Sequence, residues 1–177
     1  MKRSQATAMT LLAIFLLPVA TSAKGATVRI TIQGDGLAAP IEISDPIVRN
    51  FEVWSGPGTY SNGVEGTEGF IIDWARGVVA NRPDGLRRYE VAFYAERAQA
   101  VTRVYVVSYE LDPSTGPGYV CLPGKGDEWY RLNVSAIYRG AGLNGHCFGA
   151  TRAWEKFIRP ILRKSIASTP SHASGGP

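Results

Sequence analysis

Apolar and polar positions alternate in two stretches of the chain, 27–33 (TVRITIQ) and 129–138 (WYRLNVSAIY). In the first stretch Val28, Ile30 and Ile32 share one face, and polar side chains take the other. Successive side chains of a strand point to opposite faces of a sheet, so this period predicts a half-buried strand in each stretch.

Further strands are predicted where short apolar or alternating stretches lie between turn residues. The stretch 101–109 is apolar on both faces, which favours a central place in the sheet. The turn sequence 112–118 (DPSTGPG) should fold it back against 119–122. The other candidates are 70–74, 88–95 and 40–43, of which the last would form a hairpin with 27–33.

Helical spacing appears twice. Asp45 and Pro46 suit the cap and the first position of a helix, which predicts a short helix over about 46–53. From Thr151 onward, apolar side chains recur with helical spacing at Trp154, Phe157, Ile158, Ile161 and Leu162. Pro160 interrupts this second pattern and is expected to kink or split the helix.

Together these elements predict a mainly β fold. Several short strands with frequent turn signals are typical of an antiparallel sandwich or a partly open barrel, here of about seven strands. The short early helix and the C-terminal amphipathic helix would pack against this sheet structure.

Residues 1–23 have the pattern of a secretory signal peptide. Lys2 and Arg3 precede an apolar run over 11–17, and Thr21 and Ala23 are small residues before the expected cleavage point. The run is shorter than the roughly 20 apolar residues that a membrane-spanning helix needs. We therefore expect a secreted or periplasmic protein with no membrane span after cleavage.

Removal of the signal peptide also changes the charge. Two of the 19 basic residues leave and none of the 15 acidic ones, so the net charge falls from +4 to 17 − 15 = +2. A nearly balanced charge without a basic stripe argues against nucleic acid as a partner. The remaining chain predicts one domain over 24–165 and a disordered tail over 166–177, which is rich in Ser, Gly and Pro.

The middle of the chain carries a family resemblance. It is carried by four runs: IDW at 72–74, GLRRYEVAFY at 85–94, VYVVSYELDP at 104–113 and GYVCLPGKGDEWYRLN at 118–133. They resemble a family of uncharacterised secreted bacterial β-rich domains that share an RYEVxFY strand and a GYVxLPG hairpin. That family has no assigned activity, so the resemblance implies export and a β-rich fold and supplies no site residues.

The two cysteines, Cys121 and Cys147, allow four interpretations: a nucleophile, a zinc ligand, a disulfide or two free thiols. A nucleophilic cysteine needs a histidine within reach, but His146 is a sequence neighbour whose side chain should diverge, and His172 lies in the predicted tail. The spacing also lacks the paired ligands of a zinc site, and we expect no metal and no cofactor. An exported chain with two cysteines predicts a disulfide, with two free buried thiols as the alternative.

The glycine-rich stretch 55–69 is the best candidate for a functional surface. It holds five glycines, and long loops of this kind often carry function. Trp54, Tyr60 and Trp74 lie in it or beside it, and exposed aromatic side chains are common in binding surfaces. We therefore expect a non-catalytic domain that binds a protein or glycan partner through this loop.

An alternative reading makes the same region catalytic. Glu68 and Asp73 could form the carboxylate pair of a hydrolase that acts on an extracellular polymer, with aromatic side chains as the floor of the site. The sequence offers these ingredients without a diagnostic spacing.

Overall fold

The computed structural model describes residues 25–66, 70–97, 99–112, 116–140 and 142–168. The predicted signal peptide, Glu68 and residues 169–177 of the predicted tail lie outside the described residues.

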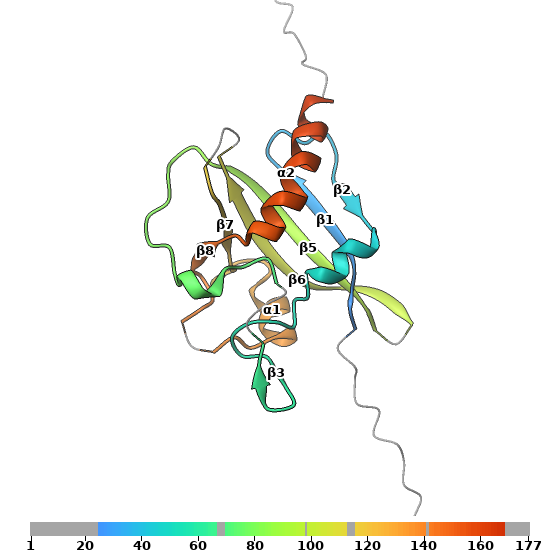
Figure 1. Ribbon diagram of the computed structural model, residues 1–177, viewed down its shortest axis with the longest axis vertical. Helices are drawn as coiled ribbons and strands as arrows, with labels where there is room; N and C mark the ends of the chain where they lie inside the picture. The colour runs from blue at the N-terminus through green and yellow to red at the C-terminus, as the bar shows by residue number, and fades with distance from the viewer. Residues whose placement is uncertain (1–24, 67–69, 98, 113–115, 141, 169–177) are drawn as a thin grey trace, which may run out of the picture.

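Six strands form one open antiparallel sheet (Figure 1). In spatial order they are β2 (Ile41–Ile43), β1 (Thr27–Gly34), β5 (Arg87–Arg97), β6 (Ala100–Leu111), β7 (Gly118–Cys121) and β8 (Cys147–Gly149). A separate hairpin consists of β3 (Tyr60–Ser61) and β4 (Val64–Glu65). The predicted mainly β class is confirmed, and the sheet does not close on itself.

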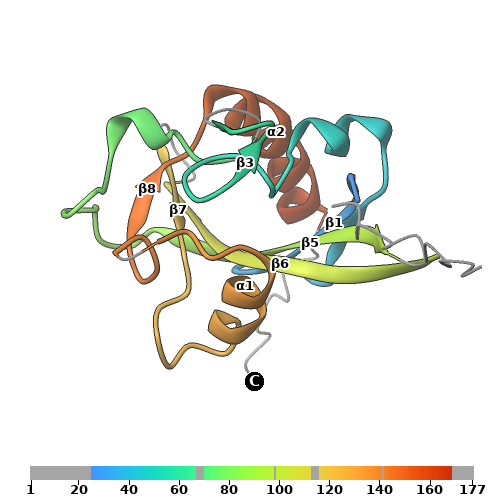
Figure 2. The same ribbon diagram turned by 90° about the horizontal axis from the view of Figure 1, so that it is seen from below.

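One helix covers each face of the sheet (Figure 2). Helix α2 (Arg152–Ala167) lies on the same side as the β3–β4 hairpin and the short 3₁₀ helix η1 (Pro46–Asn50). Helix α1 (Tyr130–Ala136) lies on the opposite side. A second 3₁₀ turn, η2 (Trp74–Arg76), follows the stretch 70–73. No helix in the described ranges is long and apolar enough to cross a bilayer.

The core lies between the sheet and α2. Trp154 of α2 is completely buried, and its ring centroid lies 5.2 Å from that of Phe51, 5.8 Å from Tyr109 and 6.4 Å from Phe93. The sheet contributes buried side chains at alternating positions, among them Ile30, Ile32, Val91, Phe93, Val107 and Tyr109. The period of two in these strands therefore marks the face that α2 covers.

Most of the predicted strands are confirmed. Strand β1 pairs with β2, and β6 occupies a central place between β5 and β7. The turn after Leu111 returns the chain so that Ser108 lies opposite Cys121, as the turn sequence predicts. The stretch 70–74 is different, because it joins the sheet only through an isolated bridge between Ile72 and Ala150. A second isolated bridge, Val78 with Phe148, follows along the outer edge of β8.

The strand predicted over 129–138 is wrong, because this stretch contains helix α1. Strand β7 pairs only with Ser108–Leu111 of β6, so Val106 has a strand neighbour in β5 but none on the β7 side. The buried amide of Asn133 replaces the missing neighbour: its Nδ2 donates to the Val106 carbonyl at 2.6 Å, and the Val106 N–H donates to its Oδ1 at 2.9 Å. Asn133 and Ile137 are both buried and lie one helical turn apart. A helix of seven residues is too short for this spacing to repeat, so the sequence shows no clear helical pattern here.

Replacing Asn133 by alanine should lower the free energy of unfolding by about 2–3 kcal/mol, because it leaves a buried N–H and a buried C=O unpaired. Urea unfolding would measure the loss, and amide exchange at Val106 should become faster. The matched control is Ser135→Ala, which removes an exposed hydroxyl from the same helix. Equal losses in the two variants would contradict the role of the amide.

Both predicted helix starts are confirmed. The Asp45 carboxylate accepts the N–H of Ile47 at 2.9 Å, and the Thr151 hydroxyl accepts the N–H of Trp154 at 3.2 Å. A split at Pro160 is wrong, because α2 runs through this residue to Ala167, two residues into the predicted tail. Pro160 is exposed, so water can pair the carbonyl that its missing N–H leaves free.

The predicted disulfide between Cys121 and Cys147 is confirmed. Cys147 lies in strand β8 rather than in a flexible connection, and it pairs directly with Cys121 across the β7–β8 ladder. Because both cysteines are bridged, the nucleophile and free-thiol readings are excluded.

Candidate functional site

Residues 60–65 of the glycine-rich stretch form a hairpin rather than a loop without secondary structure. Tyr60 pairs with Glu65, and Ser61 pairs with Val64. The two turn residues, Asn62 and Gly63, have φ angles of 51° and 78°. Positive φ at both positions is the geometry of the tight turn that Asn-Gly favours between antiparallel strands.

Hydrogen bonds close the base of this hairpin. The N–H of Gly66 donates to the Thr59 carbonyl at 2.9 Å, and both the N–H and the hydroxyl of Thr59 donate to the carbonyl of Gly56. The Glu65 carboxylate accepts the N–H of Gly58 at 2.6 Å. Gly58 is required here, since its φ is +81° and an added Cβ would lie 2.5 Å from the carbonyl oxygen of Tyr138.

A buried arginine fixes the stretch that leads into the hairpin. The side chain of Arg139 is 2% exposed, and its guanidinium donates to the carbonyls of Val53 (2.6 Å), Ser55 (2.9 Å) and Pro57 (3.3 Å). Its Nε donates to the Tyr105 hydroxyl at 3.1 Å. A guanidinium presents its donors in a rigid planar fork, which suits it to hold several acceptors in fixed places.

Carbonyl dipoles and aromatic rings compensate the charge of Arg139. No carboxylate lies within ion-pair distance of it in the described part of the chain. Its guanidinium carbon lies 4.9 Å from the ring centroid of Trp74, 5.3 Å from Phe70 and 5.4 Å from Tyr105. Burial raises the pKa of Tyr105 although the charge and hydrogen bond of Arg139 oppose it, so this hydroxyl stays protonated.

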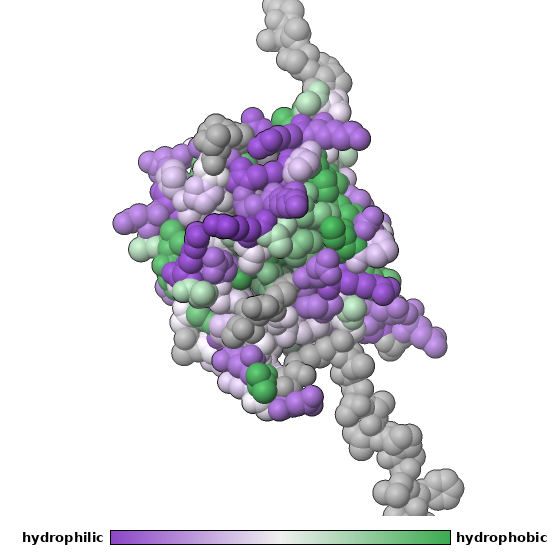
Figure 3. All heavy atoms as spheres, in the orientation of Figure 1, coloured by the Kyte–Doolittle hydropathy of each residue, from purple (hydrophilic) through white to green (hydrophobic). Residues whose placement is uncertain are grey.

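The end of the hairpin carries exposed apolar side chains. Tyr60 is 63% exposed and Val64 is 70% exposed, and Figure 3 shows apolar surface at this projection amid polar surface. Tyr60 and Val64 belong to successive cross-strand pairs of the hairpin, so the two side chains lie on opposite faces of the ribbon. Tyr138, next to Arg139 in the chain, is 66% exposed. The hairpin thus projects with both faces in solvent.

The three aromatic residues predicted for a binding surface have different environments. Tyr60 lies on the hairpin as expected. Trp54 is half-buried, with its Nε1 donating to the Gly25 carbonyl at 2.8 Å and Arg97 stacked 5.0 Å from its ring. Trp74 is half-buried between Arg139 and Phe148, whose ring lies 5.1 Å away. Both tryptophans are therefore engaged by neighbours within the domain and are not part of the exposed end of the hairpin.

The structure does not show whether Glu68 and Asp73, the carboxylates predicted for a hydrolase site, form a pair. Asp73 forms an ion pair with Arg76, 3.1 Å from its Nε, on the 3₁₀ turn η2. Glu68 lies outside the described residues, so the hydrolase reading stays a prediction. His146 is exposed beside the disulfide. Among the described residues, no group of three or more His, Cys, Asp or Glu side chains could hold a metal ion.

Two features of this site escape the sequence reading. The Asn62-Gly63 dipeptide is a strong hairpin signal, and the high glycine content around it hides the two short strands. Arg139 has no local signal at all, since the carbonyls that it holds lie 82–86 residues earlier in the chain.

Known proteins give no further guide to this hairpin. No family model, curated protein or solved structure matches the chain.

Proposed function

We propose that the protein is an exported, non-catalytic domain that binds a protein partner by inserting the 60–65 hairpin into a groove of that partner. One observation carries the proposal: a buried guanidinium holds the base of a hairpin whose end presents Tyr60 and Val64 mostly exposed to solvent. The disulfide between Cys121 and Cys147 and the leader pattern over 1–23 support an oxidising destination.

The energetics of binding explain why such a hairpin would be held in place. Ordering a flexible backbone costs about 1–2 kcal/mol per residue, and a segment fixed before binding does not lose this free energy on association. Arg139 and the bonds at the hairpin base fix the backbone in advance. Tyr60 supplies a large, stiff side chain of the kind that dominates protein interfaces.

The exposed side chains favour a groove over a flat partner surface. A ribbon that carries Tyr60 on one face and Val64 on the other can bury both only between two walls. A protein groove offers two apolar walls, whereas a flat surface would leave one side chain in water.

Site-specific crosslinking tests the proposal. A photoactivatable phenylalanine analogue at Val64 should give one discrete covalent adduct in cells that export the protein, and the same partner should be captured from position 60. The matched control is the analogue at Val101, an exposed valine on the β5–β6 hairpin. Adducts of the same kind at Val101, or none at positions 60 and 64, would refute the proposed binding surface.

A further inference from the structure

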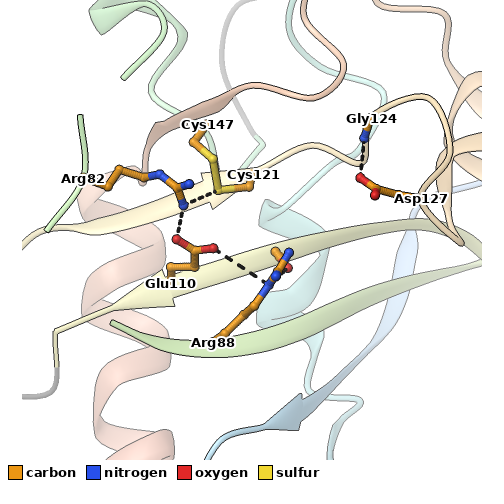
Figure 4. Close-up of a disulfide and its surroundings, with 8 residues drawn as sticks. Arg82, Arg88, Glu110, Cys121, Gly124, Asp127 and Cys147 are labelled. Carbon is orange, nitrogen blue, oxygen red and sulfur yellow. Dashed lines mark hydrogen bonds and ion pairs between the residues drawn. A yellow bond between two sulfur atoms is a disulfide. The ribbon is translucent and has the colours of Figure 1, made fainter. Parts of the chain in front are cut away.

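A second candidate site lies on the opposite face of the sheet, away from the hairpin and α2. Here the sheet and the chain that follows β7 enclose an open hollow of about 450 Å³, in the size range of small-ligand sites. Strands β1, β5 and β6 form its floor, and residues 121–123 and 127–129 form its wall. Figure 4 shows Arg88 on the floor side and Asp127 on the wall side of this region.

Hydrogen bonds hold the polar side chains of the hollow in place. Glu90 accepts from Nε2 of Gln33 at 2.9 Å and from Nε1 of Trp129 at 2.6 Å, which ties two strands to the wall. On the floor, the Arg88 Nε donates to the Ser108 hydroxyl at 2.8 Å. These contacts fix the directions of the remaining donors and acceptors before any ligand arrives.

Two more carboxylates are anchored in the same way. Asp35 accepts the backbone N–H of Arg88 at 2.9 Å, and Asp127 accepts the backbone N–H of Gly124 at 2.6 Å. Each carboxylate has about four acceptor sites, so these bonds leave acceptors to spare.

The lining mixes acceptors with donors. Of the charged residues around the hollow, Asp35, Glu90, Asp127 and Glu128 are acidic, and Arg88 is basic. None of these acids forms an ion pair within the described residues, whereas Arg88 lies 3.8 Å from Glu110. The side-chain amide of Gln33 adds both a donor and an acceptor.

The wall adds a fixed aromatic side chain. The indole of Trp129 is held by its bond to Glu90 and by Arg103, whose guanidinium carbon lies 4.6 Å from the ring centroid. Pro123 continues the apolar part of the wall, whereas Leu122, which is only 2% exposed, belongs to the core. The hollow therefore combines rigid polar groups on its floor with an apolar wall.

We infer that this hollow binds a neutral carbohydrate. A sugar hydroxyl donates and accepts at once, so it can donate to Glu90 or Asp35 and accept from Arg88 or Gln33. The C–H surface of a pyranose ring can pack against the indole of Trp129 and against Pro123. The excess of acidic side chains excludes acidic sugars by repulsion.

The test uses the full exported chain and a panel of oligosaccharides of equal length. Cellohexaose, xylohexaose and the hexamer of N-acetylglucosamine serve as neutral probes, and hexagalacturonate serves as the acidic comparison. The readout is the NMR signal of the Trp129 indole N–H, identified by its loss in Trp129→Phe. At least one neutral probe should shift this signal in a saturable way, and hexagalacturonate should not.

Two glutamates give matched variants. Glu90→Gln removes the charge from an acceptor in the hollow and should weaken binding of the neutral probe about tenfold. Glu42→Gln makes the same change on β2, where Glu42 pairs with Arg29 at 3.6 Å outside the hollow, and should leave affinity unchanged. Tyr60→Ala should also leave it unchanged, which separates this site from the hairpin.

Three results would overturn the inference. They are no saturable shift with any neutral probe, binding of hexagalacturonate as tight as that of the neutral probes, or equal loss in Glu90→Gln and Glu42→Gln.

Discussion

Replacing Arg139 by methionine should lower the free energy of unfolding by about 4 kcal/mol. The change removes a planar donor group and leaves three backbone carbonyls and the Tyr105 hydroxyl short of a partner. Each unsatisfied buried polar group costs about 1–3 kcal/mol, although relaxation and water entry recover part of the sum. Methionine keeps much of the apolar volume, so the loss reports mainly the hydrogen bonds.

Two measurements separate this loss from general damage. Urea unfolding gives the free energy, and amide exchange shows where the native state opens, which should be at Thr59 and Gly66 of the hairpin base. Crosslinking from position 64 should fall in the same variant. The control is Arg76→Met, which breaks an exposed ion pair with Asp73 and should cost less than about 1 kcal/mol.

Arg139→Lys sharpens the test. A lysine keeps the charge but cannot reach several acceptors at once, so it should be nearly as unstable as the methionine variant. A lysine variant as stable as the natural protein would contradict the role of the planar guanidinium. The positive charge alone would then account for the stability that Arg139 provides.

Replacing Trp154 by alanine should cost about 4–5 kcal/mol, the upper end of the range for a buried aromatic side chain. Its indole is fully buried, and four rings surround it: Phe51 just after η1, Phe93 of β5, Tyr109 of β6 and Phe157 of α2. Alanine would leave a cavity where α2 meets the sheet, and close packing on all sides limits its collapse.

Thermal and urea unfolding would measure this loss, with Lys156→Ala as the control at an exposed position of the same helix. Trp154→Phe should cost less, because it keeps one ring in the cluster. If the alanine variant lost no more than Lys156→Ala, Trp154 would not be the contact that holds α2 on the sheet.

The sequence predicts the sheet better than it predicts the site. Alternation marks β1 and β5, and the turn before β7 fixes its pairing with β6, because these signals are local. The stretch of α1 also alternates, and its helix depends on a distant acceptor, the backbone of Val106. The disulfide could be predicted because the chain has only two cysteines to pair.

Local sequence also fails to show which aromatic residues near the hairpin are exposed. Composition locates the segment and the exposed Tyr60, but Trp54 and Trp74 look equally suitable until their neighbours are known. Arg97 stacks on the ring of Trp54, and Arg139 stacks on the ring of Trp74. Each arginine is distant in sequence from the tryptophan that it contacts. Burial of a charged side chain is decided by tertiary contacts, so no local pattern marks Arg139.

The bridges along β8 bear on how the protein behaves at high concentration. An exposed strand edge is a template on which another chain can add and start an aggregate. At one end of the sheet, the pairs Ile72–Ala150 and Val78–Phe148 cover this template. At the other end, β2 offers only Ile41–Ile43, directly after Pro40, which has no N–H to donate. The open sheet is therefore protected against fibril growth at both of its ends.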